Sequence, residues 1–249
     1  MTVPTIHVSS GREELATAVA SALLARLANA QERGEIPHIG LTGGSVADEV
    51  HRELARLSHA SAVDWTRVVM WWGDERWLPT GSPDRNEVQA RAAFIDEAGV
   101  DEAHVHAMPA SNDGLTLADA ALAYGETVRE LGAGSFEVLM LGIGPDGHVA
   151  SLFPGHPAAE VANAIAVPVE DSPKPPPERL SLTFEAMERS NAVWFVAAGS
   201  DKADAVADSI LPRALPGSPE AIACPARVPR GTVETVWWLD RSVAPAPMR

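Results

Sequence analysis

The residues best suited to chemistry are Asp146, His148 and Ser151, which lie within one short glycine-rich segment. An imidazole titrates near neutral pH and can take a proton from water, and a neighbouring carboxylate can fix its orientation and tautomer. We therefore expect His148 to act as a general base and Asp146 to orient its ring. Ser151 is a weaker candidate nucleophile, because the segment is not a G-x-S-x-G turn and no acid is indicated for a triad.

This segment follows a run, residues 136–141, that is apolar except for Glu137 and ends at a glycine. Such a run predicts a buried strand of a parallel sheet covered on both faces. Gly142, Gly144 and Gly147 permit backbone conformations and a close ligand approach that a Cβ atom would prevent. In open α/β sheets, ligands bind beyond the carboxyl ends of strands, which is where Asp146 and His148 fall.

The same residues allow two other interpretations. The three glycines spell G-x-G-x-x-G, which is typical of a dinucleotide-binding turn. Against it, Asp146 would place negative charge beside a pyrophosphate, and Pro154 and Pro157 interrupt the expected helix, although Glu170 could supply the acidic partner. The other interpretation is a tight turn that carries a solvated histidine.

Residues 142–155, Gly-Ile-Gly-Pro-Asp-Gly-His-Val-Ala-Ser-Leu-Phe-Pro-Gly, resemble the signature of 6-phosphogluconolactonases, which share a superfamily with glucosamine-6-phosphate deaminases. The resemblance implies hydrolysis of 6-phospho-D-glucono-1,5-lactone to 6-phosphogluconate in the oxidative pentose phosphate pathway. His148 would activate the attacking water. It implies a phosphosugar lactone as the small-molecule substrate and no metal or organic cofactor.

A second matching segment is Thr42-Gly43-Gly44-Ser45, between a predicted strand at 38–42 and a helix that ends near residue 57. By itself it is either a turn with an N-cap or an anion cradle, since free amide groups and the helix dipole favour a phosphate there. In the superfamily the matching residues hold the sugar phosphate. We expect this role for Gly43, Gly44 and Ser45.

A third segment, Asp74-Glu75-Arg76, follows a predicted strand at 68–72. The charges alone could form a surface ion pair. The resemblance instead implies that Arg76 meets the substrate, where it would face the carbonyl oxygen as that atom becomes negative.

The resemblance continues past this segment and adds Asp74, Asn86 and Arg91 to the substrate-binding residues. Relatives usually have Ser before the asparagine, whereas this chain has Arg85. The replacement removes a hydroxyl and is expected to add a cation near the site.

The last matching residues are Arg179 and Lys202. Arg179 follows the proline-rich residues 171–177, which alone could be a polyproline ligand but which the resemblance makes a stiff wall that places the arginine. Lys202 could be an ordinary first-turn lysine. Because a cation at a helix start opposes the dipole, a phosphate partner explains it better. Both are expected to hold the phosphate or the sugar hydroxyls.

Two other functions within the superfamily stay open. Amino-sugar phosphate deaminases and isomerases carry a catalytic Glu where this chain has Phe153. Sugar-phosphate sensor domains of transcription repressors carry an N-terminal helix-turn-helix, whereas this sequence starts with its first predicted strand. Both differences favour the lactonase.

Composition limits the remaining possibilities. A chain of 249 residues that is 46% hydrophobic can bury one large core, and we expect a single domain over residues 1–249. The one cysteine, Cys224, excludes an internal disulfide and indicates a reducing compartment.

With no signal peptide and no apolar run of about 20 residues, we expect a cytoplasmic protein without a membrane partner. A net charge of −15 argues against nucleic acid. We expect a monomer or a small homo-oligomer.

Alternating buried strands and helices predict a three-layer α/β fold with a doubly wound, mainly parallel, Rossmann-like sheet. Further strands are expected at residues 5–8, 105–108, 164–169, 192–198 and 233–239, the last as an edge strand. Further helices are expected at 15–33, behind a Ser10–Glu13 capping box, at 117–131 despite Gly125, and from about 202 to 211. Residues 244–249 are expected to be a loose tail.

Overall fold

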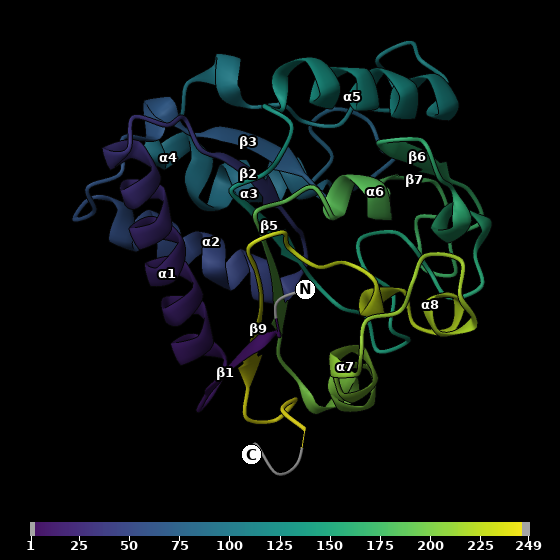
Figure 1. Ribbon diagram of the computed structural model, residues 1–249. Helices are drawn as coiled ribbons and strands as arrows, with labels where there is room; N and C mark the ends of the chain where they lie inside the picture. Colours follow the sequence, from purple (N-terminus) through teal and green to yellow (C-terminus); the bar gives the residue numbers. More distant parts are fainter. Residues whose placement is uncertain (1–2, 246–249) are drawn as a thin grey trace.

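A six-stranded parallel sheet forms the middle of the fold in the computed structural model, which describes residues 3–245 (Figure 1). Its order is β1-β9-β8-β5-β2-β3, with β1 (Thr5–Ser9), β2 (His38–Leu41), β3 (Val69–Trp72), β5 (Val138–Leu141), β8 (Ala192–Ala197) and β9 (Glu234–Asp240). Each neighbouring pair is parallel. The predicted α/β fold with a parallel, doubly wound sheet is therefore confirmed.

Helices cover both faces of this sheet. The helices α1 (Arg12–Glu32) and α2 (Ser45–Ser58) lie on one face, and α5 (Leu117–Leu131), α6 (Phe184–Met187) and α7 (Ala203–Ile210) lie on the other (Figure 1). Successive strand residues enter opposite cores: Trp71 and Trp237 pack on the α5 side, and Trp72 and Trp238 pack on the α1 side. Because both faces are covered there, β3, β5 and β8 are continuously apolar rather than alternating.

A second, antiparallel sheet of three strands has the order β4-β7-β6, with β4 (Asp74–Arg76), β7 (Arg179–Leu182) and β6 (Ala166–Val169). The strand predicted at 164–169 therefore exists but lies outside the parallel sheet. Only Gly73 separates β4 from β3, and its carbonyl accepts a hydrogen bond from the Leu182 amide at 2.8 Å. The chain thus passes directly from the end of a central strand into the small sheet.

Two predictions about single segments were wrong, and a third falls largely outside the described residues. The strand at 233–239 is not an edge strand, because β9 lies between β1 and β8. Its two tryptophans fill both cores, as a central strand requires, and the edge position goes to β1. Residues 105–108 form no strand, since only Val105 makes an isolated bridge, to Met70. In the predicted loose tail, Ala244 is fully buried, and residues 246–249 lie outside the described range.

Two local details differ from or extend the helix predictions. The N-cap of α1 is Gly11, and Ser10 donates its amide to Glu14 at 2.7 Å, not to Glu13, because the helix begins one residue later than the predicted capping box requires. In α5, Gly125 faces β6: a Cβ atom there would meet Ile165 Cβ at 3.4 Å. Close packing therefore explains a glycine inside this helix.

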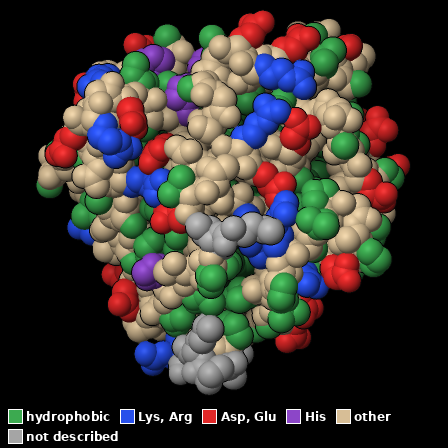
Figure 2. Space-filling view, in the orientation of Figure 1, with side chains coloured by type: hydrophobic (Ala, Val, Ile, Leu, Met, Phe, Trp, Pro, Cys, Tyr) green, Lys and Arg blue, Asp and Glu red, His purple; other side chains and the backbone are tan. Residues whose placement is uncertain are grey.

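The other elements are short. They are α3 (Asn86–Ala90), a π-helical turn (Arg91–Ile95), α4 (Asp96–Ala98), α8 (Pro219–Ala223) and 3-10 turns at Trp65–Arg67, Glu102–His104, Pro157–Glu160, Ser200–Lys202 and Pro225–Arg227. No helix within residues 3–245 is long and apolar enough to span a membrane. Acidic and basic side chains are interspersed over the face shown in Figure 2.

Candidate active site

A cavity of about 320 Å³ opens at the carboxyl ends of β2 and β5. These neighbouring strands continue toward opposite sides of the sheet, β2 to β3 and β5 to β8, so the cavity lies at a topological switch point, where α/β sheets bind ligands. Of the residues that the sequence singled out, the cavity is lined by Gly43, Gly44, Asp74, Arg76, Asn86, His148, Arg179 and Lys202.

His148 and Asp146 form a hydrogen-bonded pair, with His148 Nδ1 at 2.6 Å from Asp146 Oδ1. The bond requires Gly144, because a Cβ atom there would lie 2.1 Å from the imidazole and 2.4 Å from the carboxylate. With Nδ1 donating to Asp146, the lone pair is on Nε2, which has no hydrogen-bond partner in the described part of the chain. The arrangement gives a neutral imidazole with one free basic nitrogen.

The surroundings favour this protonation state. Burial lowers the pKa of His148, and Lys174 acts in the same direction against the raising effect of Asp146. Although burial acts to raise the pKa of Asp146, the charge and hydrogen bond of His148 and the charge of Lys174 hold it below its usual value. The pair is therefore neutral imidazole beside a carboxylate at neutral pH.

Phe153 packs against the base, with its ring centroid 4.5 Å from that of His148. The Arg179 guanidinium lies 5.7 Å from the same Phe153 centroid, within the range of a cation–π contact. Phe153 is almost fully buried. The position where deaminases are expected to carry a carboxylate is thus an apolar support for the histidine and the arginine.

Ser151 has a structural setting. It is fully buried, and its hydroxyl donates to Asp74 Oδ2 at 2.7 Å. It does not line the cavity, whereas Asp74 does. Ser151 therefore anchors Asp74 and is not available to attack a substrate.

Arg76 and Arg179 reach the cavity from the small sheet. Arg76 donates to the Asp84 carbonyl and lies 3.4 Å from Asn86 Oδ1. Arg179 is buried and donates to the carbonyls of Pro175, at 3.0 Å, and Pro176, at 3.2 Å. Because backbone carbonyls hold both guanidinium groups without neutralising their charge, both stay positive toward the cavity.

The opposite wall is built from backbone. Gly43 packs against Asn86, whose Oδ1 would lie 1.9 Å from a Cβ at position 43, and Gly44 has φ of +97°. Gly44 is the N-cap of α2 and brings no side chain to cap the first amide groups. Free amides and the helix dipole make this wall suitable for an anion.

Lys202 completes this wall. Within residues 3–245 its ammonium group makes no hydrogen bond or ion pair, although the side chain is partly buried. Burial lowers the pKa of Lys202, and Arg12 and Lys174 add to the effect, whereas Asp201 opposes it. A partly buried cation without a partner is an effective binding group for an anionic ligand.

The structure does not bring every predicted residue to the cavity. Ser45 lies outside its lining and accepts a hydrogen bond from Arg12 at 3.0 Å. Arg91 also lies outside: its guanidinium contacts Glu87 at 2.5 Å and Glu102 at 2.5 and 2.9 Å. Two carboxylates therefore hold the Arg91 guanidinium outside the cavity lining.

Arg85, expected to add a cation near the site, is instead almost fully buried beneath it. It donates to the carbonyl of Met108 at 2.6 Å and lies 3.9 Å from Glu75. Arg85 therefore fastens the loop 77–85 to the segment around residue 108 and supplies no charge to the cavity lining.

Lys174 also lines the cavity. It was not predicted as a site residue, because the proline-rich loop was interpreted only as a wall that places Arg179. Its Nζ atom lies 3.3 Å from His148 Nδ1 and 3.5 Å from Asp146 Oδ1. A compositional signal was available: Lys174 and Lys202 are the only two lysines in the chain, and every other cationic side chain is an arginine or a histidine. Both lysines line this one cavity.

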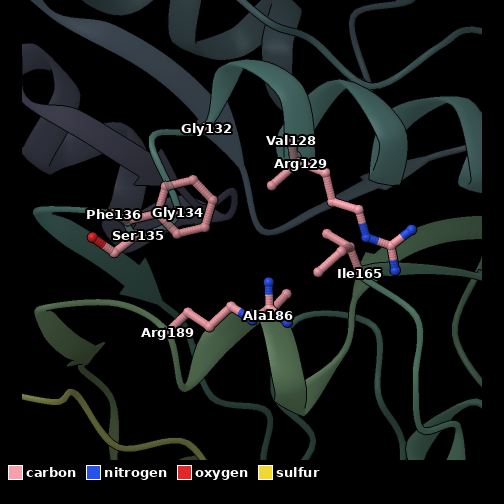
Figure 3. A pocket seen from close by; sticks show the side chains of 9 residues that line it. All are labelled: Val128, Arg129, Gly132, Gly134, Ser135, Phe136, Ile165, Ala186 and Arg189. Carbon is pink, nitrogen blue, oxygen red and sulfur yellow. The ribbon is translucent and has the colours of Figure 1, made fainter.

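A smaller cavity, of about 80 Å³, lies beyond the end of α5 (Figure 3). Arginine side chains approach it from two sides, Arg129 and Arg189, around the apolar residues Phe136 and Ile165. Its lining holds no histidine or carboxylate. Among the residues that the structure describes, no three His, Cys, Asp or Glu side chains gather as a possible metal site.

Comparison with known proteins relates this arrangement to characterised families. Residues 10–238 match the family model described as glucosamine-6-phosphate isomerases/6-phosphogluconolactonase. A 6-phosphogluconolactonase of Streptomyces coelicolor is 41% identical over 97% of this chain and 94% of its own length. One of Mycobacterium leprae is 39% identical over 95% of this chain and 92% of its own.

The fold has a solved counterpart. The crystal structure of a 6-phosphogluconolactonase from Thermotoga maritima superposes with a TM-score of 0.82, covering 96% of this chain and 100% of the other, at 24% identity. At this identity the similarity concerns the fold.

Proposed function

This chain belongs to the family of glucosamine-6-phosphate isomerases and 6-phosphogluconolactonases, and we propose from that membership that it is a 6-phosphogluconolactonase. It would hydrolyse 6-phospho-D-glucono-1,5-lactone to 6-phospho-D-gluconate in the oxidative pentose phosphate pathway. The observation that supports this most strongly is the hydrogen bond between Asp146 and His148, whose imidazole lines the same cavity as Arg76 and Lys202. One cavity thus offers a base and separate cations for two anionic groups.

In the proposed mechanism, His148 Nε2 takes a proton from water as the water oxygen bonds to the lactone C1. Asp146 holds Nδ1–H and stabilises the imidazolium that forms. When the tetrahedral intermediate collapses, the bond between C1 and the ring oxygen breaks. The imidazolium then returns its proton to that oxygen, so the enzyme ends each cycle unchanged. No metal or organic cofactor enters this reaction.

The cations have separate tasks. Arg76 would stabilise the negative charge that develops on the carbonyl oxygen, because its guanidinium reaches the cavity from the strand end near the base. Lys202 and the backbone of Gly43 and Gly44 would hold the phosphate, and Arg179, Asn86 and Asp74 would meet the sugar or phosphate oxygens. A dianionic substrate fits a chain of net charge −15 only because these cations are concentrated at one site.

We propose that the protein acts in the cytoplasm, as one domain over residues 1–249 and as a monomer or small homo-oligomer. Its partner is the phosphosugar lactone, with no role for nucleic acid or membrane. On the face shown in Figure 2, acidic and basic side chains are interspersed, which does not favour a nucleic-acid interface on that face.

A coupled assay tests the proposal. Glucose-6-phosphate dehydrogenase would generate the lactone, and its disappearance would be compared with spontaneous hydrolysis, with and without the protein. We expect acceleration by the wild type and a kcat roughly 10² to 10⁴ lower for His148→Ala, with little change in KM. A lactone half-life that the wild-type protein does not shorten would refute the function. Normal turnover by His148→Ala would refute only the base.

A further inference from the structure

The loop between β6 and β7 carries Lys174 and is held firmly in place. The carbonyl of Lys174 accepts hydrogen bonds from Arg179, at 3.2 Å, and from the Ser172 hydroxyl, at 3.0 Å. The Ser172 amide in turn donates to the Pro177 carbonyl at 2.9 Å. The loop is thus closed on itself around the Arg179 guanidinium, so that the Lys174 side chain starts from a fixed backbone.

From this backbone the Lys174 ammonium reaches the hydrogen bond between the base and its carboxylate. It lies 3.3 Å from His148 Nδ1 and 3.5 Å from Asp146 Oδ1, the two atoms that form the bond. Its side chain is 38% exposed, so the charge is partly screened but not removed by solvent. No other lysine or arginine makes a hydrogen bond or ion pair with this pair among the described residues.

Resting on the function proposed above, we propose that Lys174 is a positioning residue for the base, which keeps Asp146 a carboxylate and His148 unprotonated between turnovers. The ammonium acts by Coulomb attraction on Asp146 and by repulsion of a proton on His148. It thereby sets which protonation state of the pair meets the substrate, and it does not itself need to touch the reacting atoms.

This role of Lys174 suits the chemistry of His148, which must act first as a base and then as an acid. A histidine left alone with Asp146 would hold its proton more tightly, because the carboxylate stabilises the imidazolium. Lys174 offsets this effect, so the free enzyme presents a neutral imidazole at neutral pH. Once water has been deprotonated, the same repulsion makes the imidazolium a better donor to the departing ring oxygen.

Other charges face the imidazole as well. Asp74, from β4, favours the imidazolium and so adds to Asp146. Arg179, from β7, contacts Phe153, the ring that packs against His148. Asp146 and Asp74 both act to raise the His148 pKa. The pKa nevertheless lies below its ordinary value, because burial and Lys174 lower it.

The test compares Lys174→Met, Lys174→Gln and Lys174→Arg with the wild type. The pKa of His148 would be measured directly by NMR titration of its Cε1–H signal, assigned with His148→Gln, and the pH dependence of kcat/KM would be measured in parallel. The neutral variants should raise the His148 pKa by roughly one unit, the low end of the shift expected from a partly exposed charge within 6 Å. The midpoint of the acid limb in the pH dependence of kcat/KM should rise by the same amount. At pH values below this midpoint, kcat/KM should fall up to about tenfold, whereas its plateau at higher pH should change less. Lys174→Arg should stay close to the wild type.

Lys202→Met is the matched control, because it removes the only other lysine from the same cavity. It should raise KM and leave the His148 pKa in place. The inference is overturned if neither neutral variant moves the pKa, or if Lys174→Arg moves it as far as they do. Because the NMR titration needs no substrate, it separates this inference from the lactonase proposal, which fails only if the wild type does not hydrolyse the lactone.

Discussion

Arg76 and Arg179 lie directly opposite one another in the antiparallel register of β4 and β7. Like charges in such a pair repel, and burial together with Arg76 lowers the pKa of Arg179 against the raising effect of Asp74. The repulsion would be relieved by an anion that lies between the two guanidinium groups. The small sheet therefore presents a pair of neighbouring cations that suits a negative ligand or intermediate.

Arg76→Ala should lower kcat roughly 10²- to 10³-fold with a smaller change in KM, because the oxyanion charge appears only in the transition state. Arg76→Lys should recover part of the loss, since a point charge cannot reproduce the planar donors of the guanidinium. Steady-state kinetics of the variants would check both. Arg91→Ala is the matched control, since its side chain is held by Glu87 and Glu102 outside the cavity and should leave kcat and KM unchanged. If kcat of Arg76→Ala equals that of the wild type, Arg76 does not face the oxyanion.

The phosphate site can be tested with two substrates. Lys202→Ala should raise KM for the phosphorylated lactone roughly 10- to 100-fold, because it removes a charge-assisted bond made equally in ground and transition states. Glucono-1,5-lactone should be a far poorer substrate for the wild type, and Lys202→Ala should change its kinetics little. An equal effect of the substitution on both lactones would mean that Lys202 does not bind the phosphate.

Gly144 should be essential for the base. A Cβ atom in Gly144→Ala would lie 2.1 Å from the His148 ring, so the imidazole must leave its place beside Asp146. We expect a loss of at least 10² in kcat with a folded protein, measured by kinetics together with circular dichroism. Gly11→Ala is the control, because a Cβ there has no atom within 4 Å. An active Gly144→Ala variant would show that the hydrogen bond between His148 and Asp146 is not needed.

The sequence predicted the parts of the site that directly follow a strand. Gly43, Arg76 and His148 lie two, four and seven residues after the ends of β2, β3 and β5, so the carboxyl edge of the sheet brings them together. Arg91 lies outside the cavity lining because Glu87, four residues before it, and Glu102 hold its guanidinium, and the contact with Glu102 has no local signal in the sequence. Lys174 was missed because a proline-rich loop is more typical of a solvated surface.

Strand order is a similar case. The composition of 233–239 showed a buried strand, but pairing partners depend on the path of the whole chain, and only the structure places β9 between β1 and β8. The small antiparallel sheet could not be predicted from the sequence for the same reason. β4 has three residues and carries Asp74 and Arg76, a composition that by itself favours a loop.

Arg85 should matter for stability rather than for charge in the cavity. It is almost fully buried next to Glu75, whose carboxylate accepts the amides of Arg76, Asn86 and Glu87 at 2.8 to 2.9 Å. Arg85→Ser should lower the free energy of unfolding by about 3 kcal/mol, since it leaves Glu75 buried without its cation. Urea denaturation would measure this, with the exposed Arg52→Ser as control. Equal stability of the two variants would contradict the structural role.

His51 should make the fold sensitive to acid. It is buried in α2 against Phe94, its Nε2 has no hydrogen-bond partner, and burial lowers its pKa to about 4. Because the unfolded chain binds the proton near pH 6.5 and the folded chain near pH 4, this stabilisation is complete above pH 6.5 and is lost as the pH falls toward 4. The loss should reach about 3 kcal/mol.

Urea denaturation at several pH values should therefore show a steeper decline in the free energy of unfolding for the wild type than for His51→Phe between pH 6.5 and 4. His38, whose pKa burial also lowers to about 4, contributes equally to both proteins and cancels in the difference. Parallel curves for the two proteins would mean that His51 is protonated, or hydrated, in the folded state.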